Sequence, residues 1–509
     1  MGSSAKLSPP KFSLKFGLKS AAQRRLESAK TRAPLFSTLA RSMIDIKALR
    51  DDPERFKNGV RLKRADVNID ELLAIDARRR ELTGAVEVKR AEQNKFSKET
   101  GPELGRLKGQ LKSATGAERE AIETKLKELE RRPAELKLEA AELDKQLAET
   151  GPKWHDLMMR IPQPPAADVP VGAGAEDNKE IRRWNAPHFD PLKSFESQRG
   201  FKPKTHLELV RDLGLVDFER GVKTAGTRHY VLTGLGMKLH QAALRYAFDF
   251  ITEKRGFTAM GVPVIVKEEC MQGTGFFPFG RDQAYHIDES SRGAGHDLFL
   301  TGTGEVGLMG FHADEIIPIE QLPLKYTTQS TCFRREAGAS GKDTAGLYRI
   351  HQFDKVEQVV ICRADDTESR GWHKHMLETV EMILQGLSLP YRLLQCCTGD
   401  LGMKNEDMID VECWMPGRGD IGADGVPSGE WGETHSASRL GDFQCRRLNL
   451  RYRDADGKIH IAWALNNTVI ASPRVLIPIL ELNQNADGSV NVPHVLRPHM
   501  GGVEKITPR

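Results

Sequence analysis

Long apolar runs and paired cysteines are both missing from this sequence of 509 residues. No stretch approaches the roughly 18 consecutive apolar residues of a transmembrane helix, so we expect a soluble protein with no membrane partner. The seven cysteines form no CxxC pair and no Cys/His spacing typical of a zinc site. An odd, scattered set predicts free thiols in a reducing compartment. The chain is long enough for two or three globular domains.

Acidic residues are nearly absent from the first 42 positions, where nine residues are Lys or Arg and only Glu27 is acidic. This basic leader is compatible with an organellar transit peptide, a disordered tail, a tag or a misassigned start. We predict a cytoplasmic protein, with the mitochondrion or plastid as the alternative if residues 1–42 are a targeting signal. Met43 opens the segment that has the pattern of a folded domain.

Residues 70–150 are rich in charge, and their apolar positions form only a narrow stripe. In the second half of this segment they recur at steps of three and four, which is the spacing that joins two antiparallel helices. Glycines between residues 101 and 116, together with Pro102, predict the tip of this hairpin, and Pro133 predicts a kink. We therefore predict an N-terminal helical arm, a coiled coil, within residues 43–160.

A charge-rich helical arm is usually a solvated spacer or a dimerisation element. The alternative is RNA binding by shape, in which basic side chains follow a phosphate backbone. The candidate residues for such binding are Lys89, Arg90, Lys95 and Lys98. A Pro- and Gly-rich linker at residues 161–185 then leads to a catalytic region at residues 186–509.

The C-terminal two-thirds alternates helix and strand signals without the regularity of βαβ units. A helix pattern at residues 239–251 precedes a strand pattern at residues 257–266, which Pro263 places at an edge or an interface. Further strand signals cluster downstream. The predicted fold class is α+β, with a mostly antiparallel sheet flanked by helices.

The stretch Phe333–Glu357 has strand signals at both ends and a glycine-rich loop, which predicts an antiparallel hairpin. The i, i+2 spacing of Arg334 and Glu336 would place both on one strand face. A guanidinium there can hold phosphate, and a carboxylate can accept from an amino group. Phe353 adds a flat apolar face and Glu357 a second acceptor. An ordinary surface hairpin with ion pairs is the alternative.

Two short constellations carry polar groups on predicted strands. Thr303 and Glu305 would share a face and could hold a hydroxyl or an ammonium group. Glu433 and Ser436 supply a carboxylate and a hydroxyl, hard oxygen ligands suited to Mg²⁺ beside phosphates. We expect the intervening His435 to be structural, because a strand neighbour of Ser436 points to the opposite face.

A third constellation joins the end of a strand to the beginning of an apolar helix. Asn466 and Thr468 leave the strand, and Pro473 and Arg474 enter the helix. Proline is favoured in the first helical turn, and a helix N-terminus with an arginine nearby is an anion site. A plain buried helix is the alternative.

These stretches resemble the class II aminoacyl-tRNA synthetases. Phe333–Glu357 resembles motif 2 of that class, Leu465–Glu481 resembles motif 3, and the helix at 239–251 with the strand around Pro263 resembles the dimer-forming motif 1. The similarity is greatest to the seryl-tRNA synthetases and extends from Met43 to Gly502. Supporting stretches are His206–Leu232, Gly273–Phe279, Asp442–Asp454 and Val492–Gly502.

The resemblance implies a homodimeric ligase that activates serine with ATP to seryl-adenylate and transfers serine to tRNA(Ser), with Mg²⁺ as cofactor and tRNA(Sec) as an additional partner. The arm would grip the long variable arm of tRNA(Ser). Arg334 and Arg474 would be the catalytic residues. The implied ATP-binding residues are Arg334, Glu336, Ile350, Phe353, Glu433, Ser436 and Arg474, of which Glu433 and Ser436 would hold the metal. The implied serine-binding residues are Thr303, Glu305, Arg334, Glu357, Asn466 and Thr468.

The sequence departs from the family pattern at several positions. Gly304 replaces alanine, which adds backbone freedom. Ala345 replaces an arginine, which puts one contact to ATP or to the tRNA acceptor end in doubt, and Asn467 replaces glycine, which would reshape the serine pocket. The segment between Trp414 and Glu433 is longer and richer in glycine than in the family, which predicts a surface insertion.

Two other functions remain open. One is a synthetase-like paralogue that activates an amino acid for a carrier other than tRNA, and the retained arm argues against it. The other is a catalytically inactive, RNA-binding dimer, and the intact Arg334, Glu336, Glu433 and Arg474 argue against that.

Overall fold

The computed structural model describes residues 43–289, 297–338, 346–423 and 425–508. The basic leader and Ala345 lie outside the described residues. Within the described part of the chain, no helix is both long enough and apolar enough to span a membrane. All seven cysteines are free thiols, as predicted.

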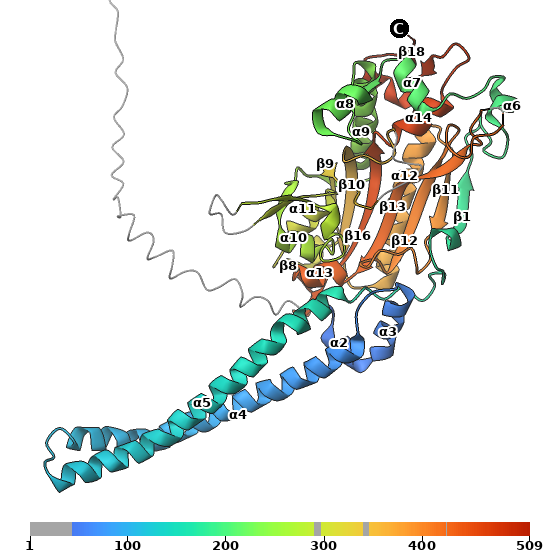
Figure 1. Cartoon of the computed structure of the whole chain (residues 1–509). Coiled ribbons are helices and arrows are strands. Elements are labelled where there is room, and N and C mark those ends of the chain that lie inside the picture. The colour runs from blue at the N-terminus through green and yellow to red at the C-terminus, as the bar shows by residue number, and fades with distance from the viewer. Residues whose placement is uncertain (1–42, 290–296, 339–345, 424, 509) are drawn as a thin grey trace, which may run out of the picture. The chain divides into compact units, whose positions relative to one another are not determined.

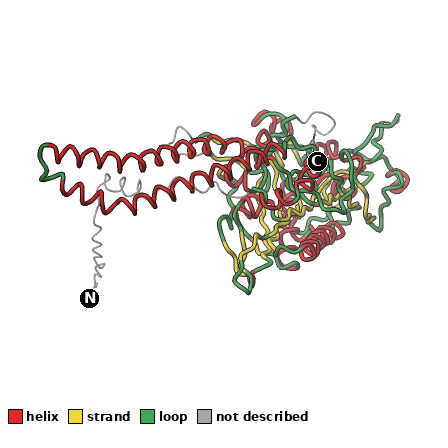
Figure 2. The backbone as a smooth tube through the Cα atoms, turned by 90° about the horizontal axis from the view of Figure 1, so that it is seen from below, coloured by secondary structure: helices red, strands yellow, loops and turns green. Residues whose placement is uncertain are grey.

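The N-terminal region is helical, and two long helices form an antiparallel pair (Figures 1 and 2). Its helices are α2 (Ile46–Asp51), α3 (Pro53–Leu62), α4 (Ile69–Gln110) and α5 (Ala117–Arg160). The side chain of Asn68 caps α4 by accepting from the amide of Glu71. Leu107, Ile122 and Leu126 are buried together where the two helices meet. The antiparallel arm predicted from the apolar stripe is therefore present.

The tip of the arm differs from the prediction. Helix α4 continues through Gly101, Pro102 and the following glycines to Gln110, so the turn lies at residues 111–116. Helix α5 runs without a break through Pro133. A proline removes one hydrogen bond from a helix, whereas pairing along the whole arm supplies many contacts. Tertiary packing thus outweighs the local preference of glycine and proline for a turn.

An eight-stranded sheet forms the centre of the C-terminal region (Figure 1). Neighbouring strands are antiparallel except β9 and β4, which are parallel, so the predicted α+β class with a mostly antiparallel sheet is confirmed. The strand order is β1 (Lys179–Trp184), β11 (Tyr391–Gln395), β12 (Asp407–Met415), β13 (Glu430–Gly441), β16 (Trp463–Ser472), β10 (Gln352–Cys362), β9 (Leu324–Phe333) and β4 (Thr258–Ala259).

The other strands of the described residues form small sheets. They comprise β2 (Val216–Asp217) with β3 (Val231–Leu232); β5 (Ile265–Lys267) with β7 (Leu298–Leu300) and β6 (Tyr285–Ile287); β15 (Ile459–Ile461) with β14 (Arg451–Arg453) and β8 (Ile316–Pro318); and β17 (Val490–Asn491) with β18 (Lys505–Ile506).

Helices α9 (Leu235–Lys254) and α12 (Asp366–Gly386) pack against the central sheet and bury one of its faces. On β12, Ile409, Val411 and Cys413 are buried in this core, while the alternate residues Asp410 and Glu412 face the other side. That second face is the polar one. The remaining α-helices are α6 (Phe195–Arg199), α7 (His206–Asp212), α8 (Phe218–Ala225), α10 (Glu268–Gly273), α11 (Glu305–Gly310), α13 (Phe443–Arg447) and α14 (Leu476–Leu482).

Three stretches are arranged differently from their sequence-based predictions. Residues 179–184, within the predicted linker, form the edge strand β1. The strand signal at residues 257–266 divides into β4 and β5, which belong to different sheets, because Pro263 cannot donate to a ladder. Strand β7 ends at Leu300 and α11 begins at Glu305, so Thr303 and Glu305 do not share a strand face.

Candidate active site

A pocket opens on the polar face of the sheet, between the β9–β10 hairpin, β13 and the segment that follows β16. Seven of the residues predicted from sequence line it: Arg334, Glu336, Ile350, Phe353, Glu433, Thr468 and Arg474. The rest of the lining is formed by Leu347, Tyr348, Lys355, Ala471 and Ser472. The fold thus brings the hairpin, the Glu433 strand and the Arg474 segment to one place.

Arg334 and Glu336, the candidate residues for binding phosphate and adenine, lie just beyond the first strand of the hairpin. Strand β9 ends at Phe333, and Glu336 has a φ of 49°, so the predicted strand geometry of Arg334 and Glu336 is wrong. Both side chains nevertheless line the pocket. The Arg334 guanidinium carbon lies 5.3 Å from the ring centroid of Phe353, and its Nε donates to the carbonyl of Gly302 at 3.3 Å. A cation and an aromatic ring therefore stand side by side.

Arg474 lies between β16 and α14 and is held from several sides. Its Nε donates to the carbonyl oxygen of Tyr348 at 3.1 Å, and its Nη1 donates to the carbonyl oxygen of Glu433 at 3.0 Å. The same Nη1 lies 3.6 Å from Oε2 of Glu433. The guanidinium carbon is 4.4 Å from the centroid of the Tyr348 ring. These contacts fix a positive charge at the pocket wall.

A β-bulge brings Glu433 and Ser436 onto one face of β13. Residues three apart in a regular strand point to opposite faces. Here Glu412 of β12 pairs with Glu433 and Val411 pairs with His435, which leaves Thr434 as the extra residue. A carboxylate and a hydroxyl then face the same side, a donor set that fits Mg²⁺. The spacing suggested the pair, but only the bulge makes it possible.

His435 is buried, as expected for a structural residue. Its Nδ1 lies 2.8 Å from Oγ1 of Thr434, and burial lowers its pKa to about 3. The imidazole is therefore neutral at physiological pH, and it does not belong to the lining of the pocket.

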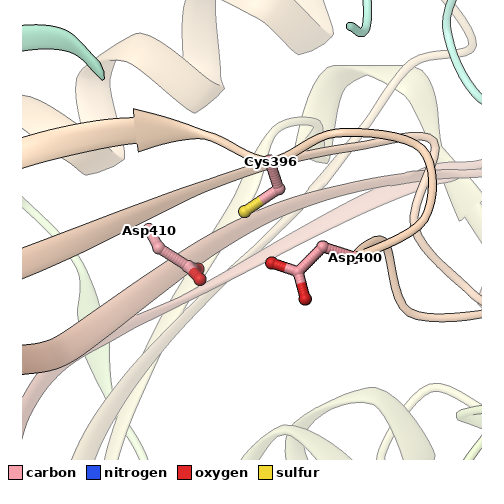
Figure 3. A group of neighbouring side chains, drawn as sticks. All are labelled: Cys396, Asp400 and Asp410. Atoms are coloured by element: carbon pink, nitrogen blue, oxygen red, sulfur yellow. The ribbon is translucent and has the colours of Figure 1, made fainter. Parts of the chain in front are cut away.

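A group of three potential metal ligands adjoins Ser436. Cys396, Asp400 and Asp410 point toward one another, with ligand atoms within 4.8 Å (Figure 3). Asp410 pairs with Ser436 across the strands and hydrogen-bonds its side chain. Burial, and then the charge of Glu433, raise the pKa of Asp410 to about 8. Burial also raises the pKa of the Cys396 thiol, which disfavours the thiolate that binds metals. Asp400 is held separately, because its Oδ2 accepts from Nδ2 of Asn178 at 2.8 Å.

Four of the residues predicted to bind the amino acid serine lie near a lysine that was not predicted from the sequence. Lys355 Nζ donates to Oγ1 of Thr303 at 2.9 Å and forms an ion pair with Glu357. Nδ2 of Asn466 donates to Oε1 of Glu357 at 3.2 Å. Thr468 is the cross-strand partner of Glu357. Burial raises the pKa of Glu357, and the charge of Lys355 opposes this. Lys355 could have been found because it lies two residues before Glu357 on one strand face.

Glu305 is engaged by other side chains. Both of its carboxylate oxygens lie 2.7 Å from Nζ of Lys404, and Oε1 also accepts from Nε2 of Gln444 at 2.7 Å. Glu305 is buried at the start of α11. The contacts of Glu305 with Lys404 and Gln444 give it a structural role. A direct contact between Glu305 and serine stays a prediction.

Two departures from the family pattern have a clear physical explanation. A Cβ added to Gly304 would lie 2.4 Å from Cγ2 of Thr328, so glycine is needed for close packing rather than for backbone freedom. Asn467 is buried, and its Nδ2 donates to the carbonyl of Met376 in α12 at 3.2 Å. It therefore faces the helices and does not line the pocket described above.

The four basic residues predicted to bind tRNA lie on α4, but they are not equivalent. Nζ of Lys89 lies 2.8 Å from Oε2 of Glu139, and Nη2 of Arg90 lies 2.6 Å from Oδ2 of Asp144. Both of these pairs connect α4 to α5. Lys95 and Lys98 are exposed. The structure thus offers these two lysines to a partner more readily than Lys89 and Arg90.

Comparison with known proteins supports both regions of the fold. Residues 43–165 match the family described as Seryl-tRNA synthetase N-terminal domain, and residues 285–483 match the tRNA synthetase class II core domain (G, H, P, S and T). The serine–tRNA ligase of Deinococcus radiodurans is 38% identical over 463 residues, which cover 91% of this chain and 98% of the relative. That of Streptomyces coelicolor is 38% identical over 467 residues, with 92% and 99% covered.

Solved structures agree with these relatives. The seryl-tRNA synthetase of Pyrococcus horikoshii, complexed with ATP, superimposes with a TM-score of 0.73 at 35% identity and covers 92% of this chain and 100% of its own. The cytoplasmic serine–tRNA ligase of Naegleria fowleri, in complex with AMP, gives a TM-score of 0.74 at 28% identity, with 92% and 99% covered. The chain therefore belongs to the seryl-tRNA synthetase family of the class II aminoacyl-tRNA synthetases, a family of ATP-dependent ligases.

Proposed function

We propose that this chain activates serine with ATP and transfers the seryl group to tRNA(Ser). The observation that carries the proposal is the continuity of the site. Arg334, Phe353 and Arg474 line one pocket with Thr468 and Lys355, and Lys355 leads directly to the buried carboxylate of Glu357. A nucleotide and a small amino acid can thus meet in one place.

The nucleotide end of the pocket offers a group for each part of ATP. Glu336 would accept from the adenine amino group, and Phe353 would stack on the ring. Arg334 would hold the α-phosphate and the serine carboxylate, and Arg474 the γ-phosphate. Glu433 and Ser436 would hold Mg²⁺, which neutralises phosphate charge when bound.

The serine end is polar and closed. Glu357 would accept from the ammonium group of serine, and Thr468, with Thr303 and Asn466 nearby, would pair its hydroxyl. Alanine would leave buried polar groups unpaired, and threonine would need room for one more methyl group. Size and polarity together therefore favour serine.

The chemistry needs no acid or base from the protein in its first step. A serine carboxylate oxygen forms a bond to the α-phosphorus while the bond to the leaving pyrophosphate breaks. Arg334 and Arg474 orient the reactants and stabilise the developing charge. In the second step a hydroxyl of the terminal tRNA ribose attacks the seryl carbonyl, AMP leaves, and the hydroxyl proton passes to the departing phosphate or to water.

Assembly and compartment belong to the same proposal. We infer a homodimer formed around α9 and β4, since β4 is an exposed edge strand of the central sheet. Sedimentation of the purified protein would test this assembly.

We place the enzyme in the cytoplasm, with the mitochondrion or plastid as the alternative. Imaging of the tagged full chain would decide between these compartments. Charging of tRNA(Sec) transcripts would test that additional partner.

The decisive experiment is serine-dependent exchange of pyrophosphate into ATP, followed by aminoacylation of tRNA(Ser). Threonine, alanine and glycine are the controls. Exchange and charging with serine alone would support the proposal. Exchange without charging would favour a ligase that uses a carrier other than tRNA. Binding of tRNA without exchange would favour a catalytically inactive paralogue.

Arg474→Ala should abolish exchange while arm-mediated tRNA binding remains. Unchanged activity of this variant would refute the role of Arg474.

A further inference from the structure

The segment between β12 and β13, expected to be a surface insertion, is fixed to the core at its beginning. The amide of Gly417 donates to Oε2 of Glu481 at 2.8 Å, and Glu481 is fully buried in α14. A Cβ at Gly417 would lie 2.5 Å from Oε1 of Glu481 and 2.8 Å from Cα of Thr205. Only glycine allows this approach, so the next residue, Arg418, starts from a defined position.

Arg418 reaches back to the wall of the nucleotide pocket. Its guanidinium carbon lies 4.2 Å from the centroid of the Tyr348 ring, and its Nε donates to Oε2 of Glu430 at 3.1 Å. The guanidinium carbon of Arg474 lies 4.4 Å from the centroid of the same ring. Tyr348 lines the pocket, and its hydroxyl donates to the carbonyl oxygen of Glu433 at 3.3 Å. One aromatic ring therefore supports two arginines.

This arrangement has an electrostatic consequence. Each cation is attracted to the face of the ring, but two like charges near one site repel each other. The carboxylates of Glu430 and Glu433 offset part of that repulsion, at 3.1 Å from Arg418 and 3.6 Å from Arg474. The side chain of Arg418 keeps 21% of its surface exposed. An anionic ligand with several charges would be attracted to both guanidinium groups.

We propose that Arg418 is a positioning residue for the polyphosphate end of ATP. Through the Tyr348 ring it holds the guanidinium of Arg474 at the pocket wall, and it adds positive charge beside that group. The ligand class is a triphosphate or its pyrophosphate product. This inference rests on the proposed function, in which Arg474 grips the γ-phosphate. It gives the insertion a role in substrate binding that its glycine-rich sequence did not indicate.

The test is serine-dependent ATP–pyrophosphate exchange by the full chain carrying Arg418→Ala, Arg418→Gln or Arg418→Lys. Loss of one cation–π contact predicts an increase of about five- to tenfold in KM for ATP, with KM for serine and the melting temperature unchanged. Arg418→Gln keeps a planar end without charge and should resemble Arg418→Ala. Arg418→Lys keeps the charge and should recover part of the loss. Inhibition by pyrophosphate should weaken in parallel.

The matched control is Ile421→Ala, because Ile421 lies in the same segment with 67% of its surface exposed; it should leave the kinetics unchanged. If Arg418 acts through the ring, Arg418→Ala and Tyr348→Ala should not be additive when combined. An unchanged KM for ATP in Arg418→Ala would overturn the inference alone. So would a defect confined to tRNA charging, or an equal rise in both KM values with a lower melting temperature. Absence of exchange in the unaltered chain would overturn the proposed function as well.

Discussion

At the residue scale, the part of the site that we propose binds serine contains one buried charge pair. Glu357 is 1% exposed and is paired with Lys355, so neither charge is strongly screened by water. An ammonium group is attracted to a carboxylate more strongly in such a poorly solvated site than at the surface. This is the physical reason for our proposal that the pair binds the ammonium group of an amino acid.

Glu357→Gln should lower kcat/KM for serine by about 100-fold, because a hydrogen bond to a charged group contributes about 1.5–3 kcal/mol and the substitution also removes the charge that pairs with Lys355. KM for ATP should change little. Pyrophosphate exchange at varied serine and ATP concentrations measures both. Glu504→Gln, in a surface pair with Arg497, is the control, and an equal loss for the two substrates would contradict the assignment.

Asp410 predicts a pH dependence of stability. Its pKa is about 8 in the folded protein, against 3.8 for the free carboxyl group. Between these values the folded state retains a proton that the unfolded state has lost, so the free energy of unfolding falls as pH rises from about 4 to about 8.

Asp410→Asn removes this titration. In buffers with EDTA, the variant should gain stability relative to the unaltered protein, and the gain should be greatest at pH 8 and smallest near pH 4. Thermal unfolding at several pH values between these limits measures the difference. Parallel pH profiles for the two proteins would show that Asp410 is already ionised in the folded state.

At the scale of the element, the arm is a separable unit. Arg79 Nη1 on α4 donates to Oγ1 of Thr150 on α5 at 2.9 Å, so the two helices lie side by side near the base of the arm. The hydrophobic cluster below that point, which includes Leu72 and Met158, does not depend on the distal turns. All fully buried members of this cluster lie outside residues 75–148, so a deletion of that range removes only Ile75 from its edge.

Deletion of about residues 75–148, with a short glycine linker between the cut ends, should leave pyrophosphate exchange within about twofold of the full chain and should remove charging of tRNA(Ser). Exchange, charging and tRNA binding assays measure the three properties. Loss of exchange together with charging would mean that the arm supports the fold of the catalytic region.

At the scale of the whole molecule, the N-terminal helices are attached to the catalytic region through a buried lysine. Nζ of Lys63, at the end of α3, donates to the carbonyl oxygens of Gly402 at 2.9 Å and of Asn405. The same loop carries Lys404, which pairs with Glu305. One loop therefore contacts both the N-terminal region and the buried side of the candidate active site.

Lys63→Met should lower the free energy of unfolding by about 1–3 kcal/mol, because buried carbonyl groups would lose their donor. Denaturant unfolding measures the change. Lys57→Met is the matched control, since Lys57 also lies on α3 but forms only partly exposed ion pairs, with Glu54 and Asp70. This substitution should leave the unfolding midpoint unchanged. Equal effects of the two substitutions would contradict the role of Lys63.

The sequence alone determined the features that depend on local spacing and residue type. The apolar stripe predicted the antiparallel arm because helix pairing follows a period of three and four residues. The strand signals around Phe333–Glu357 predicted the hairpin. The pattern of carboxylates, arginines and hydroxyls, together with the family resemblance, predicted side chains of the site, and five of these polar residues line the pocket with Phe353 and Ile350.

Only the tertiary structure decided the features that depend on register between distant segments. The bulge at Thr434 opposite β12, the hydrogen bond of Asn466 to Glu357 and the stacking of Arg418 on Tyr348 each join residues whose relation no local pattern records. A shift of one residue in strand register exchanges the two faces of a sheet. Such choices are made by packing over the whole core, so they appear only when the chain is folded.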